Sequence, residues 1–150
     1  MVDLTGAERV VVDAWIPAAI LTAAAQLEAI SVGLSTRVYE GVAPLSAKYP
    51  YIVFQSQSDP TDVRGVGVVT VMVQATYLVK VIAATDYPSI GQIVSIINSV
   101  LVTSTGATPS VGGRILSSVK NTGFSLNEIY DGVQLRNLGA VYGIFVQGLA

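Results

Sequence analysis

The most constraining feature of the sequence is an alternation of side chains that runs from Thr70 to Val81. Because successive side chains of a strand point to opposite faces of a sheet, the alternation predicts a long strand with one fully covered face. Another layer of the molecule must then cover that face. The two interleaved sets are Val71, Val73, Ala75, Tyr77, Val79 and Val81, and Thr70, Met72, Gln74, Thr76, Leu78 and Lys80.

A helical period precedes this strand. Apolar residues recur at gaps of four and three from Ile16 to Leu34, and Pro17 stands where a first helical turn tolerates proline. The pattern predicts a helix from about Ile16 to Ser31 that is ended by Gly33.

The residues before this helix are expected to form an N-terminal arm, 1–14. Its Val10-Val11-Val12 run fits either a short edge strand or a sticky segment used in assembly. The opening Met-Val-Asp-Leu-Thr has no cationic region before an apolar stretch, which argues against a secretory signal.

A second helix is expected to begin near Asp86, with Pro88 in its first turn and a wide apolar face. Asn98 and Ser99 are predicted to lie opposite that face. Polar surfaces without charge are common where subunits meet, so these two residues are the predicted subunit interface. Polar side chains and later breakers interrupt the uncharged stretch Tyr87–Gly113, and no membrane span is expected.

The remaining patterns have a period of two or carry turn signals. They predict strands at Arg37–Tyr39, Tyr51–Gln57, about Arg114–Lys120 and Leu138–Gln147, with an irregular stretch that contains an Asp131-Gly132 turn. The order of helix, strands, helix, strands indicates one α+β domain over 15–150, an antiparallel sheet with two helices packed on one face.

Charge is sparse in this chain, and that limits its partners. The 10 acidic and 8 basic residues make 12% of 150 residues, where about a quarter is usual. So few charges cover a monomer thinly, and some apolar surface is expected to meet a partner. The net charge is −2 and the basic residues are scattered, which disfavours sequence-specific binding to nucleic acid.

Residues suited to catalysis are scarce as well. The absence of Cys and His removes thiol nucleophiles, imidazole bases and the usual zinc ligands. The pair Asp59 and Asp62 supplies too few oxygens for a hard cation, and Gly65-x-Gly67 lacks the third glycine and the helix of a nucleotide loop. We therefore expect no enzyme activity, no cofactor and no metal.

The segment Ser58–Gly67 is predicted to be a projecting loop between two strands, too long for a tight hairpin. It carries three charges in a charge-poor chain, and loops on a rigid scaffold often carry function. The hypothetical interaction loop consists of Ser58, Asp59, Asp62, Arg64 and Gly67.

One segment, RVYEGVAPLSAKYPYIVFQ from Arg37 to Gln55, resembles tail-terminator or tail-completion proteins of long-tailed bacteriophages, or their relatives in prophages and gene-transfer particles. The resemblance covers about Trp15 to Gly148 by order of elements, but only Arg37–Gln55 is specific as sequence. The matching residues are Arg37, Val38, Tyr39, Tyr49, Pro50 and Tyr51.

The resemblance implies a structural virion protein without enzymatic activity. Such a subunit forms a homohexameric ring at the head-proximal end of the tail tube, stops tube polymerisation and joins the tail to the head connector or stopper. It implies the tail-tube protein and the connector as partners, and a place in the virion neck after assembly in the host cytoplasm. Two alternatives remain: a small-molecule-binding or enzymatic α+β dimer, and a tail-tube or connector subunit of the same particle.

Overall fold

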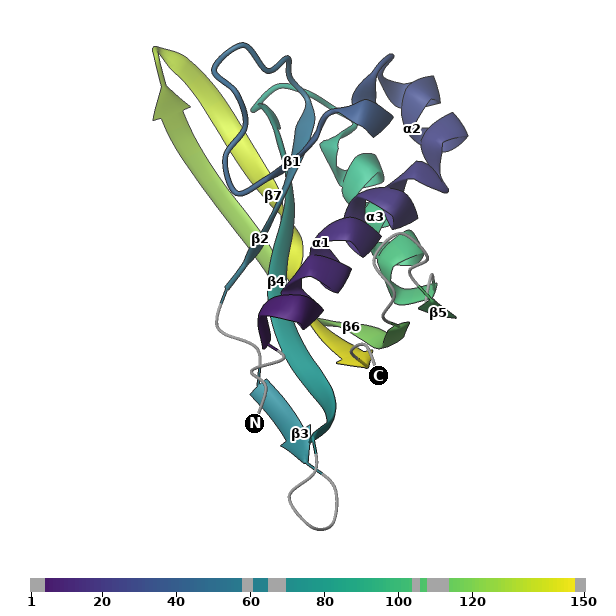
Figure 1. Ribbon diagram of the computed structural model, residues 1–150. Helices are drawn as coiled ribbons and strands as arrows, with labels where there is room; N and C mark the ends of the chain where they lie inside the picture. The colour runs from purple at the N-terminus through teal and green to yellow at the C-terminus, as the bar shows by residue number, and fades with distance from the viewer. Residues whose placement is uncertain (1–4, 58–60, 65–69, 104–105, 108–113, 148–150) are drawn as a thin grey trace.

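The computed structural model describes residues 5–57, 61–64, 70–103, 106–107 and 114–147. They form a seven-stranded sheet in the order β1-β2-β4-β7-β6-β5, with β3 also paired to β4. Three helices cover one face of this sheet, while a long hairpin reaches away from them (Figure 1). The chain therefore has the expected α+β fold.

The strands are β1 Val38–Glu40, β2 Tyr51–Ser56, β3 Thr61–Arg64, β4 Thr70–Ala84, β5 Gly106–Ala107, β6 Arg114–Tyr130 and β7 Val133–Gln147. The alternating segment lies in β4, as predicted, and β4 is central because it pairs with β2 and β3 on one side and with β7 on the other. One pair departs from the antiparallel expectation: β1 runs parallel to β2. The connection from Gly41 to Pro50 is long enough to return the chain to the end where β1 began.

The helices are α1 Thr5–Leu21, α2 Ala24–Ile30 and α3 Ile90–Thr103, with a short 3₁₀ helix, η1, at Leu34–Thr36. The expected arm 1–14 is wrong from Thr5 onward, because α1 begins there. Val11 and Val12 are 1% and 0% exposed. These two valines of the run that suggested a strand or a sticky segment are buried as part of the helix.

The predicted first helix is in fact two helices. Pro17 lies inside α1 rather than in a first helical turn, and the helix continues past it to Leu21. The break comes at Thr22 and Ala23, whose N–H groups donate to the carbonyls three residues earlier, with the Thr22 hydroxyl donating to the Ala19 carbonyl as well. The chain bends by 64° between Val11–Leu21 and Ala24–Ile30. Among the described residues no single helix is long and apolar enough to cross a membrane, although this bent pair meets the length and composition test when taken together.

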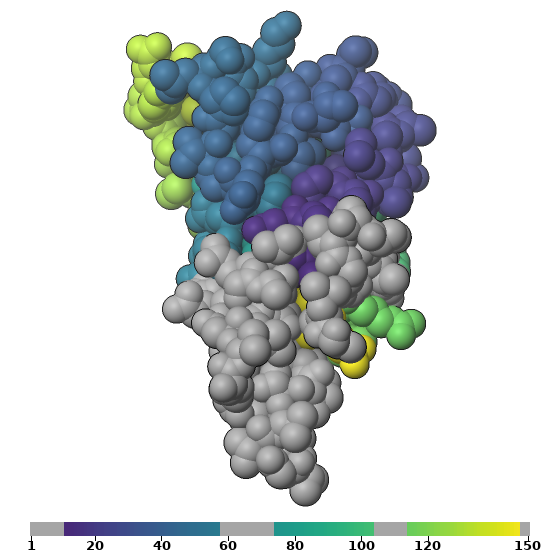
Figure 2. All heavy atoms as spheres, viewed as in Figure 1, coloured from purple at the N-terminus to yellow at the C-terminus, as the bar shows by residue number. Residues whose placement is uncertain are grey.

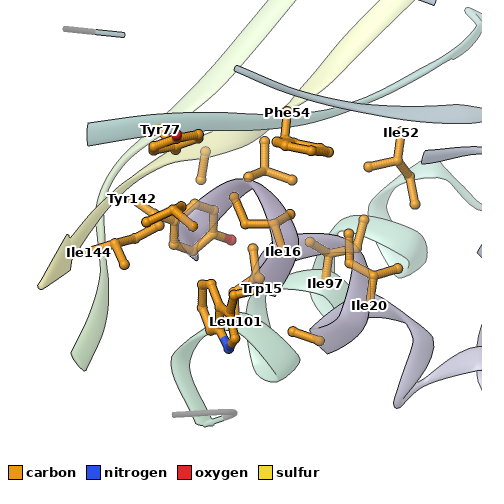
Figure 3. Packing of buried hydrophobic residues seen from close by; sticks show 14 of the residues in the cluster. Trp15, Ile16, Ile20, Ile52, Phe54, Tyr77, Ile97, Leu101, Tyr142 and Ile144 are labelled. Atoms are coloured by element: carbon orange, nitrogen blue, oxygen red, sulfur yellow. The ribbon is translucent and has the colours of Figure 1, made fainter. Parts of the chain in front are cut away.

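The main core lies between the helices and the sheet (Figure 3). Trp15, Ile16 and Ile20 of α1 and Ile97 and Leu101 of α3 meet large side chains from the strands, and all of them are buried. The strand side chains that Figure 3 labels are Ile52, Phe54, Tyr77, Tyr142 and Ile144. Burial of this cluster supplies the main driving force for folding, at about 25 cal/mol per Å² of apolar surface.

The stretch expected to be irregular after Lys120 is part of a long hairpin. β6 continues to Tyr130 and β7 begins at Val133. The Asp131-Gly132 turn between them is confirmed, with φ of 51° and 76° at the two residues, as the two-residue hairpin turn of this dipeptide requires. The predicted strand at Arg114–Lys120 is the first part of β6, and its continuation was missed because both faces of β6 are largely exposed after Lys120, which leaves no alternation to read.

Candidate assembly surface

Only part of the sheet face opposite the helices is covered, and there by a connection rather than by a helix. A small cluster of Val53, Ile82 and Leu135 lies there, with Ala43 and Tyr51 packed against it. Between the connection Gly41–Pro50 and the hairpin is a hollow of about 240 Å³. Its lining includes Tyr49, Tyr51, Lys80, Glu128 and Tyr130. The hollow combines aromatic rings with one cation and one anion.

Arg37, the first residue of the phage-like motif, ties this connection to the helices. Its Nε donates to the Pro50 carbonyl at 2.9 Å, and its two terminal nitrogens donate to the Val32 carbonyl at 2.8 Å and to Ser31 Oγ at 3.0 Å. The Tyr49–Pro50 peptide bond is cis. The motif therefore has a structural role, since it fixes where the connection meets β2.

Glu28 of α2 anchors the same corner of the molecule. Its carboxylate accepts hydrogen bonds from the Ser35 hydroxyl and from the backbone N–H groups of Gly33 and Ser35. The hydrogen bond from the Ser35 hydroxyl, with help from the Gly33 N–H, lowers the pKa of Glu28 below its usual value. Glu28 and Arg37 therefore both make hydrogen bonds to the turn between α2 and β1, one from each end of it.

The tyrosines of the motif gather beside the hollow. The rings of Tyr49 and Tyr51 stack with their centroids 5.3 Å apart, and Tyr39 meets Tyr51 edge-on at 5.9 Å. Burial raises the pKa of Tyr51 above its ordinary value, and the neighbouring Tyr49 adds to the rise. Aromatic groups with a polar end are common where proteins bind one another.

Exposed apolar side chains are concentrated on the two segments that border this hollow. Most of the large hydrophobic residues that are exposed in the described part of the chain lie on the hairpin or on the connection. Figure 2 shows the two segments side by side, the hairpin in yellow-green and the connection in blue. On the hairpin they are Leu116, Val119, Leu126, Ile129, Tyr130 and Val133, and on the connection Val42, Leu45 and Tyr49.

A row of side chains runs from β4 to β6 across the sheet face opposite the helices, which we call the open face. Lys80 is in register with Gly139, and Gly139 with Phe124. The glycine leaves the middle of the row empty, so Lys80 Nζ reaches a point 5.7 Å from the centroid of the Phe124 ring. Further along β6, Glu128 Oε1 accepts a hydrogen bond of 2.8 Å from the amide of Asn137.

The predicted interaction loop is only partly visible. Ser58, Asp59 and Gly67 lie outside the described residues. Asp62 and Arg64 do not lie in a loop, because β3 pairs with β4 from Thr61 to Arg64. β4 extends beyond the end of β2, and its first residues, Thr70–Gln74, pair with β3. The sequence pattern did not reveal this pairing.

Of the predicted interface residues, only Ser99 is exposed. Asn98 is half-buried, and its Oδ1 accepts a 3.0 Å hydrogen bond from the hydroxyl of the buried Tyr142. Asn98 therefore does not lie on an outward back of α3. The hydroxyl of a core tyrosine needs a partner, and that need turns the amide inward.

In the described ranges, no group of three or more acidic side chains is placed to hold a metal ion. The surface has instead what an interface has: exposed apolar side chains, stacked tyrosines and few charges. The hairpin and connection residues were not predicted as a site, although the Asp131-Gly132 turn signal pointed to the hairpin.

The fold is of the α+β class: helices cover one face of the sheet, and the β6–β7 hairpin extends from the sheet with exposed apolar side chains. No protein-family model and no curated protein matches the chain by sequence. Among solved structures, a chain in the virion of a native gene transfer agent particle aligns with a TM-score of 0.60 at 18% identity, over 86% of this chain and 90% of that one. A second solved chain, with a TM-score of 0.49 and 14% identity, covers 83% of this chain and 87% of its own length, and is too distant to inform function.

Proposed function

We propose that this chain is a structural subunit of a phage-like particle that forms a homohexameric ring at the head-proximal end of the tail tube. There it stops tube polymerisation and joins the tail to the head connector or stopper. The observation that supports this most is the fold shared with a chain of a gene transfer agent virion, over nearly the whole of both chains. The phage-like motif at Arg37–Gln55 agrees with it.

The surface chemistry fits a non-enzymatic, assembling subunit. A closed ring needs two different patches on each subunit, one for each neighbour. The exposed hairpin and the connection Gly41–Pro50 supply apolar area for contacts with neighbours or with the tail-tube protein. Ser99 on α3 and the segment Ser58–Gly67 remain candidates for further contacts, the first with a neighbouring subunit and the second with the tube or a neighbour. The protein then belongs to the virion neck, and to the host cytoplasm during assembly.

The test is genetic complementation in the particle that encodes this chain. Without the gene, we expect tails of uncontrolled length that are not joined to heads, and the wild-type gene should restore both properties. Microscopy of restored tail ends should show a six-fold ring attributable to this chain. Normal joined tails in the deletion strain would refute the proposal, and labelled protein along the whole tube or in the head connector would favour a tube or connector subunit.

The small-molecule alternative rests on the hollow of about 240 Å³. That volume is below the roughly 300–1,000 Å³ of typical ligand pockets. A second hollow, of about 610 Å³, lies between α2 and α3 and falls within that range; its lining includes Gln26, Ser89 and Gln92. A compound that raises the melting temperature in a saturable way would favour a pocket function.

A further inference from the structure

The outer edge of β6 is open over most of its length. Within the described chain, only Gly106 and Ala107 of β5 pair with it, and they reach no further than Arg114 and Ile115. The register with β7 shifts between Ile115 and Ser117 and again between Lys120 and Thr122. From Thr122 to Tyr130 the strand is regular, so its outward N–H and C=O groups form an even row.

This edge lacks the features that usually protect an edge strand. Proline, frequent charges, bulges or a covering segment normally prevent pairing with another chain. The stretch Thr122–Tyr130 contains no proline, its one charged residue is Glu128, and no described segment pairs with it. Leu126, Ile129 and Tyr130 are 48%, 73% and 55% exposed. The edge is open for pairing with another strand.

The stretch is complementary to a second copy of itself. An antiparallel alignment centred on Leu126 sets the two leucines against each other, with Thr122 against Tyr130 of the partner subunit. Gly123 then lies against Ile129 of the partner subunit and leaves room for its side chain. Directly opposed side chains lie about 4.5–5.5 Å apart on the same face, close enough to pack.

Charge supports the same alignment. It sets Phe124 against Glu128 of the partner subunit, on the open face of the sheet. Lys80 already lies over Phe124, with Nζ 5.7 Å from the ring centroid, so the partner's carboxylate enters beside a cation. Because the alignment is symmetric, this contact forms twice.

We propose that the free chain forms a two-fold dimer by antiparallel pairing of β6 from Thr122 to Tyr130, with Lys80 facing Glu128 of the partner subunit. This contact is isologous, whereas ring contacts are heterologous. The dimer is the state of the free subunit and goes beyond the proposed function. Its test in solution is independent of the ring seen on tail ends.

Two double variants test the alignment. Ser125 and Asn127 are exposed and lie opposite each other in the paired copies. S125E/N127E brings carboxylates together across the dimer, while S125K/N127E brings opposite charges together. Asn127 is in register with Arg136 of β7, so a glutamate at 127 could pair with Arg136 in the same chain. Because both variants carry N127E, this effect is the same in each, and they differ only at position 125. We expect a dissociation constant about tenfold or more higher for S125E/N127E than for S125K/N127E.

Sedimentation equilibrium over a dilution series gives the molecular mass and the dissociation constant of the wild type and of both double variants. The wild type should approach twice 15.6 kDa at high concentration. If the wild type remains a monomer at high concentration, or forms a hexamer, the proposal is wrong. Equal dissociation constants for the two double variants overturn it as well.

Crosslinking gives a second readout, because the chain has no cysteine of its own. L126C places the new thiol next to the two-fold axis and should form a disulfide dimer on mild oxidation. V133C is the matched control, since Val133 is 45% exposed against 48% for Leu126 but lies on β7. If L126C crosslinks no more than V133C does, the pairing is wrong.

Discussion

At the scale of single residues, the missing side chain of Gly139 shapes the open face of the sheet. A Cβ at this position would lie 2.1 Å from the Val79 carbonyl oxygen and 2.6 Å from Lys80 Cα. Both are backbone atoms of the neighbouring strand, which cannot move without disturbing the sheet pairing. The glycine thus allows β4 and β7 to approach closely, and it allows Lys80 to extend across to Phe124.

Gly139→Ala should therefore destabilise the protein by about 3 kcal/mol, since the close contact forces a backbone shift. Gly91→Ala is the matched control, because a Cβ there meets nothing within 4 Å. Alanine in α3 should stabilise the fold by about 0.5–1 kcal/mol. Urea unfolding of the two variants measures both effects. Similar stabilities for the two would contradict this account of the sheet.

The buried side chain of Tyr142 affects how the stability of the protein depends on pH in the alkaline range. Burial raises the pKa of Tyr142 from 10.0 to about 12. Below pH 10 the phenol is protonated in both the folded and the unfolded state. Above it, the unfolded state loses the proton first, so stability falls as pH rises from about 10 to about 12.

Tyr142→Phe should lower stability near neutral pH by about 1 kcal/mol, because Asn98 loses its hydrogen bond. The same variant should lose less stability than the wild type between about pH 9 and about pH 11. Urea midpoints at the two pH values measure this difference. An equal loss of folding stability in both proteins would show that ionisation of Tyr142 does not cause the fall in stability at alkaline pH.

At the scale of elements, Arg37 joins parts of the chain that pack poorly by themselves. η1 has three residues and β1 has three, too few to be stable alone. One guanidinium donates to the Pro50 and Val32 carbonyls and to Ser31. A planar group with several donors suits this task, and a lysine ammonium does not reproduce its geometry.

Arg37→Lys should cost about 1–2 kcal/mol of folding stability, since at least one hydrogen bond to a carbonyl is lost although the charge is kept. Lys48→Ala, at an exposed position of the same connection, should remain within about 0.5 kcal/mol of the wild type. Thermal unfolding of the three proteins gives the comparison. A lysine variant as stable as the wild type would show that the charge alone holds this corner.

At the scale of the whole molecule, the helices use one face of the sheet for folding and leave the hairpin and the connection available for partners. The segment Ser58–Gly67 adds three charges to a chain that has few. Two acids and one arginine give a net negative charge, which suits a surface that DNA passes without binding. We therefore expect this segment to matter for assembly rather than for folding.

Replacing Asp59, Asp62 and Arg64 together by alanine should change folding stability by no more than about 0.5 kcal/mol, as isolated charges usually do. Replacing residues 65–69 by Asn-Gly, which joins Arg64 to its partner Thr70 through a two-residue turn and retains β3, should keep the fold but reduce tail joining or length control. Complementation of a deletion strain, scored by infectious or transducing particles and by tail lengths in micrographs, measures the effect. Full yields with normal tails would make the segment a simple connector.

The sequence by itself determined the features that follow from local periods and turn chemistry. The alternation in β4, the apolar face of α3 and the Asp131-Gly132 turn are encoded within a few residues of each other, and the α+β class follows from their order. These features are readable because each depends on side chains that are neighbours along the chain.

Only the tertiary structure decided the rest, because it depends on contacts between distant segments. Burial against the sheet made Val11 and Val12 part of a helix, and a hydrogen bond from Tyr142 turned Asn98 inward. Strand order placed Lys80 over Phe124, although the two residues are far apart in the sequence. The exposed β6 edge is a property of that strand order too, and no local pattern shows which strand lies at the end of a sheet.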